Sequence, residues 1–337
     1  MSTTLDIIFP VFGVVIAGYL FARRGWMSEE GLKGLTRFVF FLAIPALLFR
    51  TLAESDPTTA LRLDVILTYY AGVVSVFLLT LGLGMFGFRV GLSASAIFGM
   101  GGIFSNIVLL GIPIIQVAFG TEGMLTFMIV MSVHSIILLP ATTLLVELGR
   151  LKANLPGKSS ATGIDQDRTE TSGTQEAASP TTNVAREAVG AVVRNPLLIA
   201  IVAGLLFGAS GLELPRVVNR FADLVGQAAG PAALFSLGGT LAACRIAGAL
   251  PASLSIVAMK MFAFPAIVFA TGYYVFALEP LPLAVLTVMA CLPIGVNVYV
   301  MARSYDVAVE TATTATIISM LIGPVTLALI LASFLPV

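Results

Sequence analysis

The chain is poor in charged residues, which make up 11% of its 337 residues, whereas soluble globular proteins contain about 25%. So few charges are not enough to form a water-exposed surface. Hydrophobic residues make up 58% of the chain, and its mean hydropathy is +1.02. The formal net charge is zero, so nothing indicates a nucleic-acid partner. The composition predicts an all-α polytopic membrane protein.

Cysteine and histidine are also scarce. Cys244 and Cys291 both lie in apolar stretches, which favours small buried side chains over a disulfide. No metal-ligand spacing or phosphate-binding loop is present, so we expect neither a metal nor a cofactor, and the coupling ion is left open between H⁺ and Na⁺. The first apolar run lacks a small-residue cleavage site after a basic start, so we interpret it as a span rather than a signal peptide.

Long apolar runs bounded by charged and turn residues predict ten membrane spans. Residues 149–190 are rich in Ser, Thr, Gly and charge, which predicts a flexible cytoplasmic linker. The predicted spans are 5–22, 32–53, 64–88, 93–119, 121–148, 195–211, 221–244, 251–277, 282–303 and 307–334.

The basic residues set the orientation. Of the 18 Lys and Arg residues, 13 follow odd-numbered spans, four lie on the other side, and Lys260 lies inside a span. The positive-inside rule places the odd-side loops in the cytoplasm. Both termini are then expected outside a bacterial-type inner membrane.

Two halves of the chain resemble each other. The segments "IPALLF" (44–49) and "GPAALF" (230–235) match. The shift in residue number that carries Ile44 onto Gly230 is the repeat offset. The same offset places three spans of the first half on spans of the second. Each half has five spans, so the second half enters the membrane from the opposite side. This predicts two inverted repeats, residues 1–148 and 191–337, an organisation typical of secondary transporters.

The fourth span of each half contains residues that weaken a helix. The first window holds Asn106, Gly111 and Pro113, and the window on which the repeat offset places it holds Pro293, Gly295 and Asn297. Groups freed by a helix break are costly in lipid unless they line a cavity. We therefore predict that the two breaks form one site, where half-helix N-termini hold an anion. The predicted substrate-binding residues are Asn106, Gly111, Ile112, Pro113, Pro293, Ile294, Gly295, Asn297 and Tyr299.

These segments resemble a known family. "SNIVLLGIPIIQVAFG" (105–120) and "LPIGVNVYVMARSYDV" (292–307) are similar to segments of the auxin efflux carriers, a family that includes plant PIN-formed carriers and bacterial homologues. "FLAIPALLF" (41–49) and "AMKMFAFPAIV" (258–268) resemble its second and eighth spans. The bile-acid:sodium symporters are more distant relatives with the same fold.

The resemblance implies two crossing broken helices, the fourth and ninth spans, near Pro113 and Pro293. It also implies a scaffold of spans 1, 2, 6 and 7, a mobile core of spans 3–5 and 8–10, an elevator mechanism and a homodimer that meets through the scaffold. Substrates in the family are organic anions such as auxin, malate and malonate. At Asn297 the plant members have an apolar residue, which favours a small carboxylate here.

Three further polar residues are candidates for charge or ion coupling. Lys260 lies in the middle of a span, where it either attracts substrate or braces the crossing. His134, the only histidine, is either a proton carrier or a hydrogen-bonded packing residue. Asp64 lies near the outer end of the third span, at the interface or in an outer vestibule.

The predicted function is therefore a secondary carrier for small organic anions, auxin-like or malate- and malonate-like. The alternative is a sodium-coupled symporter of the bile-acid type. A channel and an intramembrane enzyme are weaker alternatives. The segment "GASG" (208–211) resembles the serine motif of rhomboid proteases, but Ser210 ends a predicted helix and His134 precedes it in the chain, the reverse of the order in that family.

Overall fold

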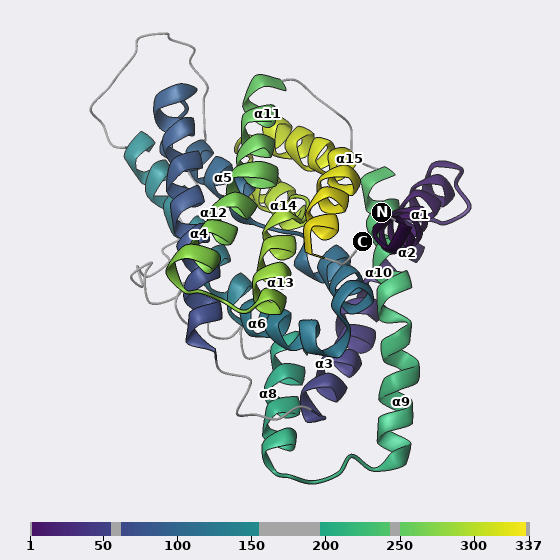
Figure 1. Cartoon of the computed structure of the whole chain (residues 1–337). Helices are drawn as coiled ribbons and strands as arrows, with labels where there is room; N and C mark the ends of the chain where they lie inside the picture. Colours follow the sequence, from purple (N-terminus) through teal and green to yellow (C-terminus); the bar gives the residue numbers. More distant parts are fainter. Residues whose placement is uncertain (1, 55–61, 155–195, 243–249, 335–337) are drawn as a thin grey trace, which may run out of the picture.

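The structure is a computed structural model that describes residues 2–54, 62–154, 196–242 and 250–334 (Figure 1). The described ranges are helical throughout, apart from turns and one isolated β-bridge between Ser105 and Ile294. Six of the helices are long and apolar enough to cross a membrane. The chain is thus an all-helical, multi-pass membrane protein.

The first half contains four long helical segments and one short helix. Several segments include a π-helical turn, labelled η, between two α-helices or at the end of one. The elements are α1 (Ser2–Arg23), α2 (Glu29–Phe38), η1 (Val39–Ala43), α3 (Ile44–Ala53), α4 (Leu63–Gly82), η3 (Leu83–Gly87), α5 (Leu92–Ile103), η4 (Ile107–Gly111) and α6 (Ile112–Asn154).

The second half follows a similar order. Figure 1 shows α9 leading into α10, which lies next to α1, and α11 to α14 grouped with α4 and α5. The elements are α8 (Pro196–Ala209), α9 (Arg216–Gln227), α10 (Ala229–Ala242), α11 (Leu250–Ala258), η5 (Met259–Ala263), α12 (Phe264–Ala270), η6 (Thr271–Val275), α13 (Pro280–Cys291), α14 (Val296–Tyr305) and α15 (Val309–Phe334).

The predicted span boundaries agree closely with these helices. The predicted division between residues 119 and 121 coincides with Gly120, whose φ of 61° interrupts α6 in a backbone region that favours glycine. Two boundaries differ. The predicted linker 149–190 begins too early, because α6 continues to Asn154, and the rest of it lies outside the described residues. The predicted seventh span, 221–244, falls on α9 and α10, and the amphipathic helix α9 already begins at Arg216.

Glycines allow a close contact between a helix of the first half and one of the second. Helices α1 and α10 pack against each other, and a Cβ at Gly18 would lie 2.1 Å from the Phe235 carbonyl oxygen. A backbone atom cannot move aside as a flexible side chain does. In contrast, a Cβ at Gly13, on the same helix α1, would meet nothing within 4 Å.

Gly18→Ala is therefore expected to lower the melting temperature of the detergent-solubilised protein. Overpacking of this kind costs about 1–3 kcal/mol, which corresponds to a fall of roughly 2–10 °C for a protein of this size. Gly13→Ala is the matched control, because it makes the same chemical change without a contact, and its melting temperature should stay at the parent value. Equal melting temperatures for the two variants would contradict the close α1–α10 packing.

Candidate functional site

Two helices break in the middle of the molecule. Helix α5 ends at Ile103, and Phe104 takes an extended conformation (φ −77°, ψ 100°). Helix α13 ends at Cys291, and Leu292 is extended (φ −56°, ψ 142°) because the residue before a proline avoids the helical region. After each break a new helix begins, η4 at Ile107 and α14 at Val296.

The two extended segments pair with each other. The Asn106 N–H donates to the Pro293 carbonyl at 2.9 Å, and the Gly295 N–H donates to the Phe104 carbonyl at 2.8 Å. A Cβ at Gly295 would lie 2.9 Å from the Phe104 ring, so this close approach requires a glycine. The crossing satisfies backbone groups that the breaks would otherwise leave unpaired in lipid.

Hydrogen bonds of two serines hold the crossing in place. The Ser105 hydroxyl donates to the Met289 carbonyl at 2.8 Å, in the last turn of α13. The Ile294 N–H donates to the Ser319 hydroxyl oxygen on α15 at 3.0 Å. Both serines are completely buried. The breaks are therefore held in place by polar contacts that a packing defect would not have.

A cavity of about 370 Å³ opens beside the crossing. Asn106 reaches it with only 6% of its surface exposed, and its side-chain nitrogen has no hydrogen-bond partner in the described structure. Two helices begin at this cavity, and the first N–H groups of a helix have no acceptor within it. Its lining residues are Phe40, Phe41, Phe104, Ser105, Asn106, Ile107, Val108, Leu109, Leu139, Pro196, Leu197, Gly295, Val296 and Asn297.

The cavity suits a small anion on chemical grounds. Helix N-termini carry partial positive charge and free donors, and the Asn106 amide adds a donor that nothing in the described protein accepts. A volume of this size is within the range of small-molecule sites. The remaining walls are largely apolar, which strengthens each polar contact made inside.

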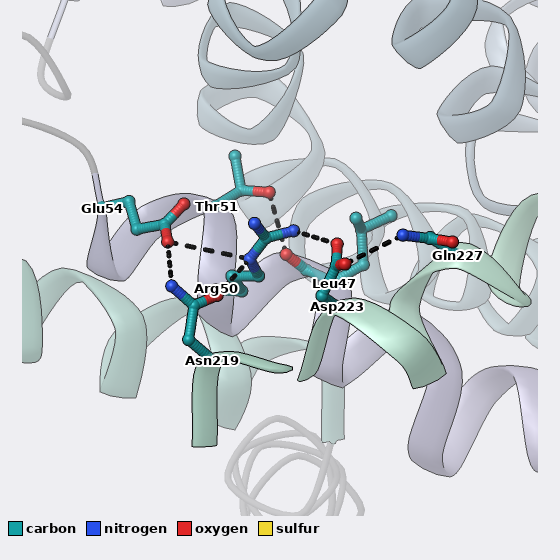
Figure 2. A network of polar contacts seen from close by, with 7 residues as sticks. All are labelled: Leu47, Arg50, Thr51, Glu54, Asn219, Asp223 and Gln227. Carbon is teal, nitrogen blue, oxygen red and sulfur yellow. Dashed lines mark hydrogen bonds and ion pairs between the residues drawn. The ribbon is translucent and has the colours of Figure 1, made fainter. Parts of the chain in front are cut away.

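A second cavity, also about 370 Å³, lies further along the same broken helix. Its lining includes Ile112, Pro113 and Gln116 from α6, and Arg50 from α3. Figure 2 shows that Arg50 faces helix α9, where its guanidinium donates to Asp223 and, at 2.6 Å, to the Asn219 side-chain oxygen. The Asn219 amide in turn donates to Glu54 at 2.7 Å. This network joins α3 to α9 at the edge of the second cavity.

The predicted site residues divide between the two cavities. Asn106, Gly295 and Asn297 line the first, and Ile112 and Pro113 line the second. The remaining four line neither of them. They are Gly111, Pro293, Ile294 and Tyr299.

The first predicted break, the window from Asn106 to Pro113, overlaps the observed one at Asn106. The resemblance implied a crossing near Pro113, and this position is wrong, because the chain is extended at Phe104–Asn106 and Pro113 is the second residue of α6. A proline is tolerated in the first turn of a helix, where its missing N–H is not needed. The helix N-terminus that faces the cavity is therefore at Ile107–Leu109. In the second half, the predicted break at Pro293–Gly295 is the observed one.

The three candidates for charge or coupling lie apart from both cavities. Lys260 and His134 are completely buried. The Lys260 ammonium donates to backbone carbonyls, and the His134 ring packs against Phe104 with 5.0 Å between ring centroids. Neither His134 nitrogen has a hydrogen-bond partner among the described residues. Asp64 forms an ion pair with Arg62 at 2.6 Å at the start of α4.

The sequence did not predict the part of the first cavity wall that is formed by segments other than the two broken helices. Phe40 and Phe41 precede α3, and Pro196 and Leu197 begin α8. The repeat offset carries Pro10 and Val11, which line the second cavity, onto Pro196 and Leu197, but nothing in the sequence marked either pair as part of a cavity wall.

Comparisons with known proteins agree with a transport role. The family described as "Membrane transport protein" matches residues 4–331. The chain is 26% identical over 327 residues to a Rhizobium meliloti protein named "Putative malonate transporter", covering 97% of this chain and 94% of that one. It is also 26% identical over 347 residues to "Auxin efflux carrier component 8" of Arabidopsis thaliana, covering 95% and 94% of the two chains.

Proposed function

We propose that this chain is a secondary carrier for small organic anions. The premise is that the chain belongs to the membrane transport protein family, which is the auxin efflux carrier family that its sequence resembles. The observation that carries this proposal is the Asn106 side-chain nitrogen, which has no hydrogen-bond partner among the described residues and is buried at a cavity where two helices begin. A substrate carboxylate accepts hydrogen bonds from this amide and from the N–H groups at the starts of η4 and α14. Asn297, exposed on the first turn of α14, orients the rest of the substrate.

A small dicarboxylate is the substrate class that we favour. One relative along nearly the whole chain is named for malonate and another for auxin. Asn297 adds a second amide to the cavity wall, and two separated polar groups match two carboxylates better than one carboxylate attached to an indole ring. Family membership makes this chain a transporter rather than an enzyme. Ser210, the serine of the GASG segment, caps its own helix by donating to the Phe207 carbonyl at 2.6 Å.

The fold that we propose for this mechanism is ten spans in two inverted repeats. Contacts related by the repeat offset support it: Gly18 approaches the Phe235 carbonyl, and Gly204 approaches the Phe49 carbonyl. Turn geometry supports it as well, because Arg89 and Ala277, which follow equivalent π-turns, both have positive φ (53° and 45°). The repeats comprise residues 1–148 and 191–337.

The pairing of the two cavities supports alternating access. Phe40 and Phe41 line the first cavity, and Gly226 and Gln227, onto which the repeat offset carries them, line the second. In the proposed fold, each cavity has equivalent scaffold segments on one side and the core on the other. In an elevator motion, spans 3–5 and 8–10 slide against spans 1, 2, 6 and 7, and one cavity opens as the other closes.

The carrier acts in a bacterial-type inner membrane with both termini outside, as a homodimer that meets through the scaffold.

Transport in proteoliposomes tests this function. We expect labelled malonate uptake to saturate, and to be accelerated by unlabelled malonate inside the vesicles, because a carrier exchanges substrate through one alternating site. A thermal-shift screen of monocarboxylates, dicarboxylates and indole acids identifies the better ligand. Current that does not saturate would indicate a channel and contradict the proposal.

Replacing sodium with choline in the same assay separates the two coupling alternatives. We expect uptake to continue in choline, because the described walls of the first cavity contain no Asp or Glu to bind sodium. Loss of uptake in choline alone, with recovery in sodium, would favour the sodium-coupled symporter.

A further inference from the structure

The side chain of a lysine is completely buried next to the crossing. Lys260 lies on the π-turn η5, in the middle of the segment that crosses beside α13. None of its surface is exposed. A buried charge of this kind is expensive unless polar partners compensate it. The described partners of the ammonium are two backbone carbonyls and the face of the Phe264 ring, and none of these is acidic.

The two carbonyls belong to the broken end of α13. The Lys260 ammonium donates to the Ala290 carbonyl and, at 2.7 Å, to the Leu292 carbonyl. In an unbroken helix, the Ala290 carbonyl would accept from the Ile294 N–H. That N–H instead donates to Ser319. The break therefore leaves these carbonyls at the negative end of a half-helix dipole without their helical donors.

These groups together make a site for a monovalent cation. Carbonyls at half-helix ends are the ligands that coordinate coupling cations in transporters with broken helices, and an aromatic face 5.1 Å from the ammonium adds a cation–π contact. We propose that the Ala290 and Leu292 carbonyls and the Phe264 ring form a cation site at the crossing, and that the Lys260 ammonium occupies it permanently as a tethered cation.

If the chain is the carrier proposed above, the tethered ammonium takes the place of a coupling cation at the crossing. A permanent ammonium neutralises the C-terminal end of α13 without a dissolved ion. The N-terminal end of α14 then stays available for the substrate anion, and transport needs no sodium at this position. Lys260 is thus a positioning residue that acts through the crossing and lies outside both described cavities.

Truncation followed by chemical rescue tests the cation site without any substrate. Lys260→Ala removes three carbons and the ammonium, which n-propylammonium replaces atom for atom. We expect the variant, purified in sodium chloride, to melt about 10 °C below the parent, since stranded buried polar groups are costly. Purification in n-propylammonium chloride should recover at least half of this loss. Choline chloride, whose cation is too large for the site, should recover none.

Lys260→Met is the matched control, because its side chain keeps the length of the lysine stem and fills the site with an uncharged group. It should melt below the parent and should not respond to n-propylammonium. The proposal is overturned if Lys260→Met is as stable as the parent, or if n-propylammonium raises the melting temperatures of both variants equally. It is also overturned if Lys260→Ala has the same melting temperature in all three salts. A failed malonate assay changes none of these outcomes, so the two proposals fail separately.

Discussion

Asn106→Ala is expected to reduce saturable malonate uptake by about a hundredfold, close to complete loss, while the purified protein keeps the melting temperature of the parent. The Asn106 side-chain nitrogen has no partner in the described structure, so its removal strands no protein group. A hydrogen bond to a charged group contributes about 1.5–3 kcal/mol, which corresponds to roughly a tenfold to hundredfold change in affinity. The substrate also loses the contact that orients it against the crossing, which lowers uptake further.

Asn297→Ala is expected to give the same loss, because this side chain is exposed on the cavity wall, where it contacts the substrate in the proposed site. The measurement for both variants is initial uptake rate against malonate concentration, beside a thermal melt. Asn106→Asp serves as the charge control, because a carboxylate at this position repels an anion and should abolish uptake as well. Unchanged uptake in both alanine variants would contradict the site assignment.

The helices were the part of this fold most open to prediction. Lipid admits few backbone structures, so apolar length and turn residues locate the spans, and the predicted division at Gly120 matches the observed interruption. The repeat offset was equally informative for the proposed scaffold, where it relates the Gly18 contact to the Gly204 contact. In the proposed core the offset is larger, since α5 ends at Ile103 and α13 ends at Cys291.

This difference explains why the first break was misplaced. A single offset aligned Asn106, Gly111 and Pro113 with Pro293, Gly295 and Asn297 as if they were equivalent. In the structure, the Asn106 N–H and the Gly295 N–H make the matching bonds of the crossing. Pro113 is a strong helix-breaking signal in sequence, but a proline breaks a helix only where its missing N–H is needed. Local composition alone does not reveal which turn that is.

The other misses concern contacts between distant segments. The cavity wall formed by Phe40, Phe41 and Pro196 depends on how these distant segments pack against the crossing. The role of Lys260 depended on which carbonyls the break in α13 leaves free. The sequence limited Lys260 to two roles, substrate attraction or bracing of the crossing. The carbonyl contacts favour bracing.

A disulfide between scaffold and core is expected to abolish transport reversibly. Gly230 on α10 belongs to the proposed scaffold, and Pro113 on α6 belongs to the proposed core. A Cβ built at Gly230 lies 3.7 Å from the Cβ of Pro113, within the range of about 3.5–4.5 Å that a disulfide spans. Gly230→Cys with Pro113→Cys, in a background of Cys244→Ala and Cys291→Ala, should form the bond on mild oxidation. Uptake should fall to background and return after reduction.

The elevator hypothesis depends on the comparison with a disulfide inside one body. Leu47 on α3 and Gly226 on α9 both belong to the proposed scaffold, and a Cβ at Gly226 lies 3.3 Å from the Leu47 Cβ, slightly closer than usual. The pair Leu47→Cys and Gly226→Cys should therefore also form a bond, yet leave transport intact, because the scaffold does not change shape. Each single-cysteine variant should transport malonate under oxidation and under reduction. Full transport with the Gly230–Pro113 disulfide formed would mean that scaffold and core do not slide at this contact, and the two cavities would then need another explanation.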